Sequence, residues 1–216
     1  MDLSQARFNM VEQQVRPWEV LDQLVLDAML AVPREHFVPA AYRRLAYSDI
    51  RIPLGFGALM FAPRWEGRLL QALAPAQHER ALEIGTGSGY LSALLARLCG
   101  EVVSVDIQPQ FVEDASRKLR AAGVENVRCM AGDALEGWAA DAPFDLIAVT
   151  ASSPARRPAI EAQLAPGGRL FMVIGTAPAM EARLITREGD NFIEESLFEL
   201  ELEPLRGAES PPRFQF

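Results

Sequence analysis

Cysteine and histidine are scarce in this sequence of 216 residues. The two cysteines, Cys99 and Cys129, lie far apart and form no C-x-x-C pair, so neither a disulfide framework nor a cysteine metal site is expected. The two histidines, His36 and His78, have no set of partners that suits a metal, and we expect no metal ion. This cysteine usage is typical of a reducing compartment and indicates a cytoplasmic protein.

Long apolar runs and an excess of positive charge are missing as well. No stretch reaches the roughly 18 consecutive apolar residues of a membrane span. Residues 1–15 lack the basic and apolar regions of a secretion signal, so no membrane association is expected. The 29 acidic residues outnumber the 21 basic ones and give a net charge of −8. Such a field repels polyanions, so nucleic acid is not an expected partner.

Residues 79–206 alternate short apolar runs with helical patterns, which is typical of a parallel sheet with helices on both faces. Five strands are predicted in this region: Ala81–Ile84, Val102–Val105, Val127–Met130, Leu146–Val149 and Leu170–Ile174. Two further runs, Glu181–Thr186 and Ile193–Leu202, alternate apolar with polar residues around a turn and predict an antiparallel hairpin. The sequence therefore predicts a doubly wound, mostly parallel α/β sheet of seven strands.

Residues 1–78 lack this alternation and are predicted to form a helical and loop extension. An apolar face over Leu21–Val32 predicts a first helix in it. The stretch Ile52–Pro63 is rich in glycine and proline and is interpreted as a structured loop, followed by an amphipathic helix over Pro63–Leu73. Residues 207–216, which contain two prolines, are predicted to be a loose tail.

A glycine-rich loop, Leu82-Glu83-Ile84-Gly85-Thr86-Gly87-Ser88-Gly89-Tyr90, follows the first predicted strand. Glycines at alternate positions let the backbone turn tightly and approach a ligand, with a helix N-terminus behind it. Asp106 ends the second strand, 21 residues past Gly85. This spacing places a carboxylate beside the ribose of a nucleoside bound over the loop. A tight turn without a ligand is the alternative, but the acid favours an adenosine-type cofactor.

The same loop, with Glu83 just before its first glycine, resembles the first motif of S-adenosylmethionine-dependent methyltransferases. Nicotinamide dinucleotides bind to G-x-G-x-x-G, whereas this loop reads G-x-G-x-G, so NAD stays the weaker alternative. Gly132-Asp133 resembles the part of the methyltransferase fold that meets the adenine, and that fold also carries a C-terminal antiparallel hairpin. The resemblance implies S-adenosyl-L-methionine as the cofactor and S-adenosyl-L-homocysteine as its product.

Longer motifs resemble the protein-L-isoaspartate O-methyltransferases over residues 9–206. They comprise Val32–Pro39, Leu45–Asp49, Ile52–Gly57, Pro63, Leu82–Tyr90, Val102–Val105, Asn126–Val127, Gly132–Asp133, Phe144–Ala151 and Leu164–Leu170. This family methylates the free carboxyl group of isoaspartyl residues in damaged proteins, which starts their repair. The resemblance implies a class I methyltransferase fold in which residues 1–78 cover the cofactor site and residues 79–206 form the cofactor-binding core. Isoaspartyl proteins are the implied partners and a monomer is expected, although the sequence does not fix the oligomeric state.

Carried over to matching positions, the resemblance implies a set of cofactor-binding residues. They are Glu83, Gly85, Thr86, Gly87, Gly89, Asp106, Ile107, Gly132 and Asp133. Within this set the three loop glycines would hold the methionine end, Asp106 the ribose and Asp133 the adenine.

The acceptor loop departs from the family pattern. The family carries a Gln-Thr-Ile-Ser-type stretch whose Ser and Thr line the substrate carboxyl and the methyl donor, but this sequence reads Ala58-Leu59-Met60-Phe61-Ala62, with Phe61 at the serine position. No catalytic residue follows from the sequence. A carboxylate acceptor is already ionised at neutral pH and needs no general base, so the requirement is positioning.

Candidate acceptor contacts are Arg64, at the start of a predicted helix, and the polar residues Thr150, Ser152 and Ser153 after the fourth strand. Two alternatives to isoaspartyl methylation stay open. One is a methyltransferase with a different, more apolar acceptor, because Leu59, Met60 and Phe61 are apolar. The other is a non-catalytic module that binds the cofactor as a sensor or adaptor, with Phe61 blocking the acceptor pocket.

Overall fold

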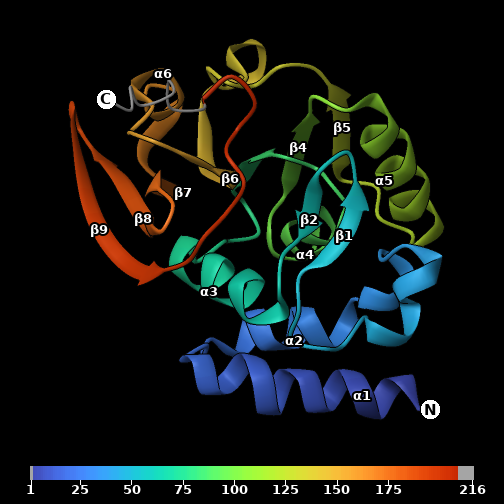
Figure 1. Ribbon diagram of the computed structural model, residues 1–216. Coiled ribbons are helices and arrows are strands. Elements are labelled where there is room, and N and C mark those ends of the chain that lie inside the picture. Colours follow the sequence, from blue (N-terminus) through green and yellow to red (C-terminus); the bar gives the residue numbers. More distant parts are fainter. Residues whose placement is uncertain (1, 209–216) are drawn as a thin grey trace, which may run out of the picture.

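A sheet of seven strands crosses the molecule in the order β5-β4-β3-β6-β7-β8-β9 (Figure 1). The computed structural model describes residues 2–208. The strands are β3 (Arg80–Ile84), β4 (Glu101–Asp106), β5 (Val127–Ala131), β6 (Phe144–Ser153), β7 (Leu164–Thr176), β8 (Ala179–Glu188) and β9 (Asn191–Glu199). Strands β3 to β7 pair in parallel, while β8 is antiparallel to both of its neighbours. The predicted α/β fold class is confirmed, with a C-terminal antiparallel hairpin.

Helices flank this sheet, and α1 lies on the far side of α2 and α3 from the strands (Figure 1). They are α1 (Leu3–Met10), α2 (Gln23–Ala31), α3 (Pro63–Leu73), α4 (Tyr90–Leu98), α5 (Pro109–Ala121) and α6 (Pro158–Glu161). Short 3-10 turns lie at Arg16–Trp18, Arg34–His36, Ala40–Leu45 and Ala139–Asp141, and a π-helical turn at Val11–Val15 extends α1. No helix in residues 2–208 is both long and apolar enough to span a membrane.

Alternation along the strands divides the core into two clusters. Ala81 and Val102 face the cluster that contains helices α2, α3 and α4, whereas the next residues, Leu82 and Val103, face the cluster that contains α6. Successive side chains of a strand point to opposite faces, so a strand buried on both faces reads as a continuous apolar run. This is why the parallel strands were recognisable in the sequence.

The N-terminal region shares the first of these clusters with the sheet: Met10, Met29 and Leu70 belong to it together with Leu94 and Phe171. The division at residue 78 stays a prediction. Of the predicted loose tail, residues 209–216 lie outside the described residues.

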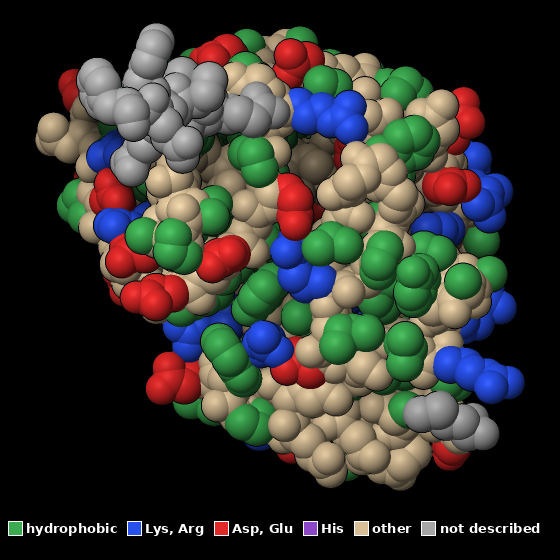
Figure 2. Space-filling view, in the orientation of Figure 1, with side chains coloured by type: hydrophobic (Ala, Val, Ile, Leu, Met, Phe, Trp, Pro, Cys, Tyr) green, Lys and Arg blue, Asp and Glu red, His purple; other side chains and the backbone are tan. Residues whose placement is uncertain are grey.

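Acidic side chains gather over the sheet edge formed by β8 and β9, in line with the net negative charge (Figure 2).

The stretch interpreted as a structured loop contains a β-hairpin. Strands β1 (Ile52–Gly55) and β2 (Ala58–Met60) pair antiparallel, with Ile52 opposite Met60. The turn between them places Gly55, Phe56 and Gly57 at positive φ. The glycines and the proline that suggested a loop in the sequence are the residues that a hairpin turn and an edge strand tolerate.

The first predicted helix is shorter than its apolar pattern. Helix α2 begins at Gln23 because the Asp22 carboxylate caps it, accepting a hydrogen bond from the Leu24 main-chain N–H at 2.8 Å. Leu21 and Leu24 belong to the apolar pattern of the sequence but are exposed in the structure. The buried face is formed by Val25, Leu26, Ala28 and Met29.

Candidate functional site

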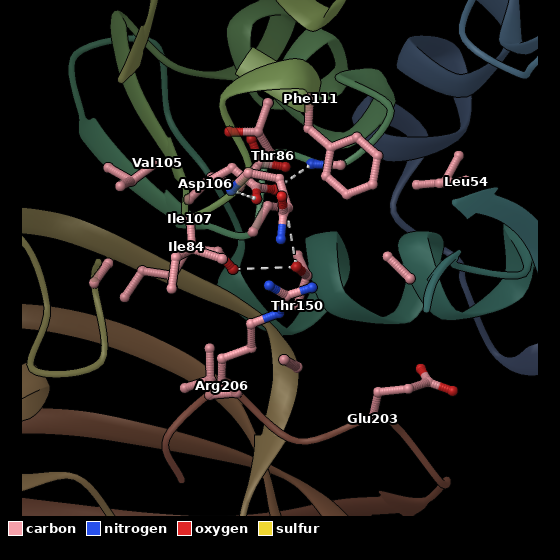
Figure 3. A pocket seen from close by; sticks show the side chains of 18 of the residues that line it. Leu54, Ile84, Thr86, Val105, Asp106, Ile107, Phe111, Thr150, Glu203 and Arg206 are labelled. Carbon is pink, nitrogen blue, oxygen red and sulfur yellow. Dashed lines mark hydrogen bonds between the residues drawn. The ribbon is translucent and has the colours of Figure 1, made fainter. Parts of the chain in front are cut away.

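A pocket of about 210 Å³ opens at the carboxyl ends of the central strands (Figure 3). Six segments form its walls: the glycine loop after β3, the end of β4 with the start of α5, the residues Gly132–Leu135 after β5, Thr150 and Ala151 of β6, the β1–β2 hairpin with α3, and the C-terminal segment Glu203–Arg206. In open α/β sheets this edge is where ligands bind. The pocket therefore lies where the sequence predicted a nucleoside.

The glycine loop brings main-chain atoms to the pocket surface. Gly85 has φ +101°, and a Cβ added there would lie 2.1 Å from the Thr150 hydroxyl oxygen. That hydroxyl lies 3.1 Å from the Ile84 carbonyl and 3.0 Å from the Gly85 carbonyl, so it is held against the loop. Only glycine fits such a cradle, because another residue would combine backbone strain with a steric clash.

Asp106 connects the end of β4 to the glycine loop. Its Oδ2 accepts a hydrogen bond from the Gly87 N–H and its Oδ1 accepts one from the Gln108 N–H, each at 2.9 Å (Figure 3). A carboxylate has about four lone-pair sites, so two acceptor sites stay available on Asp106. This arrangement suits the two hydroxyl groups of a ribose.

Glu83 is fully buried and lines the pocket from β3, two residues before the first glycine of the loop. Its Oε2 accepts hydrogen bonds from the Ser92 hydroxyl and, at 2.5 Å, from the Ser104 hydroxyl, whereas its buried Oε1 has no partner among residues 2–208. Burial raises the pKa of Glu83 to about 8, the two serines oppose this shift, and the charge of Asp106 adds to it. A buried carboxyl with an unpartnered oxygen suits a ligand that brings a hydrogen-bond donor with positive charge.

All the predicted cofactor residues except Gly89 line the pocket. Gly89 has φ +81° and precedes α4, and a Cβ added there would lie 2.9 Å from the Ala115 Cβ on α5. It therefore serves the packing of α4 against α5. Gly132 lines the pocket and is restricted in size too, since a Cβ there would lie 2.7 Å from the Trp138 ring.

Among the candidate acceptor contacts, only Thr150 lines the pocket. The Arg64 guanidinium forms an ion pair with Asp49 and lies 4.7 Å from the Trp18 ring and 5.4 Å from the Trp65 ring, which holds it outside the pocket. Ser152 is buried and donates a hydrogen bond to the Leu202 carbonyl at 3.0 Å. It anchors the C-terminal segment, and Ser153 is buried beside it without lining the pocket.

The side of the pocket formed by the β1–β2 hairpin is apolar. Leu59, Met60 and Phe61 line it from the hairpin, and Phe61 packs edge-on against the Trp65 ring at 6.1 Å between centroids. The Phe61 carbonyl accepts a hydrogen bond from the buried Arg34 guanidinium. Phe61 is thus fixed at both ends and forms a wall of a pocket that stays open.

Two parts of the pocket escaped the sequence reasoning. The C-terminal segment runs back beside β6, where the Leu205 N–H donates to the Ser152 carbonyl at 2.8 Å and Arg206 donates to the Phe56 carbonyl at 3.2 Å (Figure 1). No local sequence pattern predicts that the C-terminal segment returns to β6.

The second part of the pocket that the sequence did not predict is Glu66, which is 2% exposed on α3. Its signal was present, because Glu66 interrupts the apolar helix face formed by Leu69, Leu70 and Leu73.

Comparison with known proteins places this site in a family. The family model described as "Protein-L-isoaspartate(D-aspartate) O-methyltransferase (PCMT)" matches residues 6–207. The chain is 40% identical over 213 residues to Protein-L-isoaspartate O-methyltransferase 2 of Marinobacter nauticus, covering 98% of this chain and 97% of that protein. It is 43% identical to Protein-L-isoaspartate O-methyltransferase of Anaeromyxobacter dehalogenans, covering 82% of this chain and 85% of that protein.

Solved structures agree with the sequence comparisons. A protein-L-isoaspartate O-methyltransferase superimposes with a TM-score of 0.78 and 25% identity, covering 92% of this chain and 65% of that one. A protein from Plasmodium falciparum, titled as a putative member of that group in complex with S-adenosyl-L-homocysteine, shares the fold with a TM-score of 0.77 at 19% identity. The chain described here belongs to the protein-L-isoaspartate(D-aspartate) O-methyltransferase family.

Proposed function

We propose that this protein transfers the methyl group of S-adenosyl-L-methionine to the free carboxyl group of isoaspartyl residues in damaged proteins. The observation that carries the proposal is the pocket at the carboxyl ends of β3 and β4, where the glycine loop, Asp106 and Glu83 converge in a chain that matches the family over residues 6–207. The relatives that carry the name of this activity match nearly the whole chain.

The residues present fit the cofactor. Asp106 would hold the ribose hydroxyls with its free acceptor sites, Ile107 and Asp133 would border the adenine, and the cradle around Gly85 would admit the methionine end. When bound, the cofactor supplies a methyl group on a positively charged sulfur. The unpartnered Glu83 oxygen lies where a cationic part of this molecule would be favoured.

The chain's own residues then have to position the acceptor and exclude water. A side-chain carboxylate is ionised at neutral pH, so methylation forms the ester bond without any proton transfer and requires no general base. The reaction needs in-line placement of the carboxylate beside the methyl group and a site closed to water. The apolar hairpin wall with Phe61 and the C-terminal segment Glu203–Arg206 cover part of the pocket and would shield a bound acceptor from water.

We extend the proposal to the arrangement of the chain. The β1–β2 hairpin belongs to residues 1–78, and Leu54 on it lies 3.2 Å from the position that a Cβ on Gly87 would take. This contact supports a role for residues 1–78 as the cover of the cofactor site. Isoaspartyl proteins are the proposed substrates, and the cysteine usage supports a cytoplasmic location.

A second candidate is a methyltransferase for an apolar or cationic acceptor. The pocket is lined by the acids Glu66, Glu83, Asp106, Asp133 and Glu203, but by one basic residue in the described chain, Arg206. This balance and the apolar wall of Leu59, Met60 and Phe61 favour an acceptor that carries no negative charge.

A peptide assay separates the candidates. Purified protein is incubated with methyl-labelled cofactor and an isoaspartyl peptide, with the aspartyl peptide of the same sequence as the control. Base-labile methyl ester on the isoaspartyl peptide alone is the expected result. Cofactor turnover only with another acceptor would favour the second candidate, and cofactor binding without turnover on any acceptor would contradict both.

A further inference from the structure

We propose that Glu66 adds a second carboxyl group, beside that of Glu83, to a two-carboxyl site for the ammonium group of the cofactor. The inference rests on the proposed function only for the identity of the cofactor. Both side chains line the same pocket, Glu66 from the first turn of α3 and Glu83 from β3, and both are buried. The role assigned to Glu66 is to bind the methyl donor, with no part in transferring the methyl group.

Each acid uses one oxygen for the protein and leaves the other free. Glu66 Oε2 accepts a hydrogen bond from the Arg34 guanidinium, and among residues 2–208 its Oε1 has no hydrogen-bond donor. Glu83 Oε2 is held by Ser92 and Ser104, and its Oε1 is buried without a partner. Two carboxyl groups that each keep an unused acceptor at one pocket form a site for a group with several N–H donors.

Arg34 is the positioning residue for Glu66. Its guanidinium binds Glu66 and the Phe61 carbonyl and lies 4.8 Å from the centre of the Tyr90 ring. Arg34 is fully buried and does not line the pocket, so its positive charge stays behind Glu66. The contact fixes the direction of the Glu66 carboxyl and leaves the pocket surface acidic.

The chemistry of the cofactor selects the ammonium group. S-adenosyl-L-methionine carries two cationic centres, the sulfonium and the ammonium, and only the ammonium has hydrogens to donate to carboxylate oxygens. Asp106 occupies the ribose end of the pocket with its two main-chain hydrogen bonds. Asp133 is proposed to border the adenine, and Glu203 forms an ion pair with Arg51. Glu83, which precedes the glycine loop, and Glu66 then remain for the amino-acid end.

Electrostatics couples this site to pH. Burial raises the pKa of Glu66 to about 8, Arg34 opposes the shift and the charge of Glu83 adds to it, while Glu83 itself is raised to about 8. The charged and titratable groups that interact with the pair are Arg34 on the 3-10 turn, Tyr90 on α4, Asp106 on β4 and Cys129 on β5. A bound cation favours the ionised acids, so ammonium binding releases protons and strengthens as the pH rises toward 8.

Calorimetry with two ligands tests the proposal. S-adenosyl-L-homocysteine carries the ammonium group, and 5′-methylthioadenosine keeps the adenosine and the sulfur but lacks the amino-acid part. For the unmodified protein we expect the affinity for S-adenosyl-L-homocysteine to rise between pH 6.5 and 8, with proton release seen in buffers of different ionisation enthalpy. The affinity for methylthioadenosine should not change over this range.

The variant Glu66→Gln should weaken S-adenosyl-L-homocysteine binding at pH 8 by about tenfold or more, the loss expected for a charge-assisted hydrogen bond. Methylthioadenosine binding should stay within about twofold, which also shows that the variant is folded at the site. Glu161→Gln is the matched control, because Glu161 is buried and paired with Arg156 but does not line the pocket. It should leave both affinities unchanged.

Equal weakening of both ligands by Glu66→Gln, or unchanged affinity for both, would overturn the proposal. If the single variant does not fold because Arg34 loses its partner, the double variant Arg34→Met with Glu66→Gln replaces the buried ion pair by neutral side chains and faces the same two-ligand comparison. Failure of the proposed function is a separate result, namely no methyl ester on the isoaspartyl peptide. Absence of methyl ester would contradict the proposed function, but the comparison of the two ligands would still decide whether Glu66 binds the ammonium group.

Discussion

The Asp106 carboxylate accepts a hydrogen bond from the main-chain N–H of Gly87 at 2.9 Å, which joins the end of β4 to the middle of the glycine loop. One side chain thus fixes the loop and presents acceptor atoms to the pocket. The acid and the glycine lie 19 residues apart in the chain: Asp106 ends β4, and Gly87 lies in the loop that follows the neighbouring parallel strand β3. The proposed nucleoside site is therefore built from the ends of two neighbouring strands, and it needs both the loop and the acid.

Replacement of Asp106 tests whether this acid contributes to cofactor binding. We expect Asp106→Ala to weaken S-adenosyl-L-homocysteine binding by about 1 to 3 kcal/mol, because charge-assisted hydrogen bonds to the ribose and the support of the Gly87 N–H are lost together. Isothermal calorimetry measures the change. Asp114→Ala, on the exposed side of α5, is the control and should bind as the unmodified protein does. Unchanged affinity in the Asp106 variant would remove this residue from the site.

The cradle around Gly85 makes a steric prediction. An alanine Cβ at this position would lie 2.1 Å from the Thr150 hydroxyl oxygen, and the alanine backbone would be strained at φ +101°. We therefore expect Gly85→Ala to lower the free energy of unfolding by about 1 to 3 kcal/mol and to abolish cofactor binding. Gly123→Ala is the matched control, since φ is +70° there with open space around it. It should lose about 1 kcal/mol and bind normally. Thermal unfolding with and without S-adenosyl-L-homocysteine measures the stability and the binding of both variants. Normal binding by the Gly85 variant would show that a side chain is tolerated at this position.

The parts of the fold that follow from local pattern were predictable. The apolar runs Ala81-Leu82 of β3 and Val102-Val103 of β4 are buried on both faces of the sheet, which made these strands recognisable in the sequence. The glycine spacing after β3, together with Asp106, indicated a nucleoside site. The parts that depend on contacts distant in the chain were not. Arg64 was a reasonable anion-binding candidate at a helix start, but its charge is taken by Asp49 on a preceding turn.

Contacts between residues distant in the chain also explain the other features that the sequence did not predict. Nothing near Arg206 in the sequence shows that the C-terminal segment returns to β6, because that position is set by hydrogen bonds to Ser152 and by a donor contact to Phe56. The exposure of Leu24 also depends on which neighbours α2 meets. Glu66 is different: a charge on an apolar helix face was visible in the sequence, and only the structure shows that it faces the pocket.

Titration of Glu83 gives a prediction for stability against pH. The pKa of this residue is about 8 in the folded protein, against about 4.5 for an ordinary glutamate, so between these values the folded state holds a proton that the unfolded state has released. The stabilising contribution of the protonated Glu83 is therefore fully present below about pH 4.5. It is lost as the pH rises to 8, and the free energy of unfolding falls by at most about 1.4 kcal/mol per pH unit. Glu83→Gln should show a shallower fall.

Urea denaturation at pH 5, 6, 7 and 8 compares the two proteins without ligand. The difference in unfolding free energy between Glu83→Gln and the unmodified protein should move in favour of the variant as the pH rises. Parallel curves for the two proteins would mean that Glu83 titrates normally and that burial does not hold its proton.

The apolar acceptor wall makes the last prediction. Leu59→Thr with Phe61→Ser places two hydroxyl groups beside the proposed carboxylate acceptor, so kcat/KM for an isoaspartyl peptide should rise by about tenfold, the value of one well-placed hydrogen bond. Stability should fall by about 3 kcal/mol, because Phe61 is buried and loses its edge contact with Trp65. The double variant Leu59→Ala with Phe61→Ala opens the same space without hydroxyls. If it gains the same activity, space and not hydrogen bonding limits the acceptor, and if neither variant gains activity, the carboxylate is already held by other groups of the pocket.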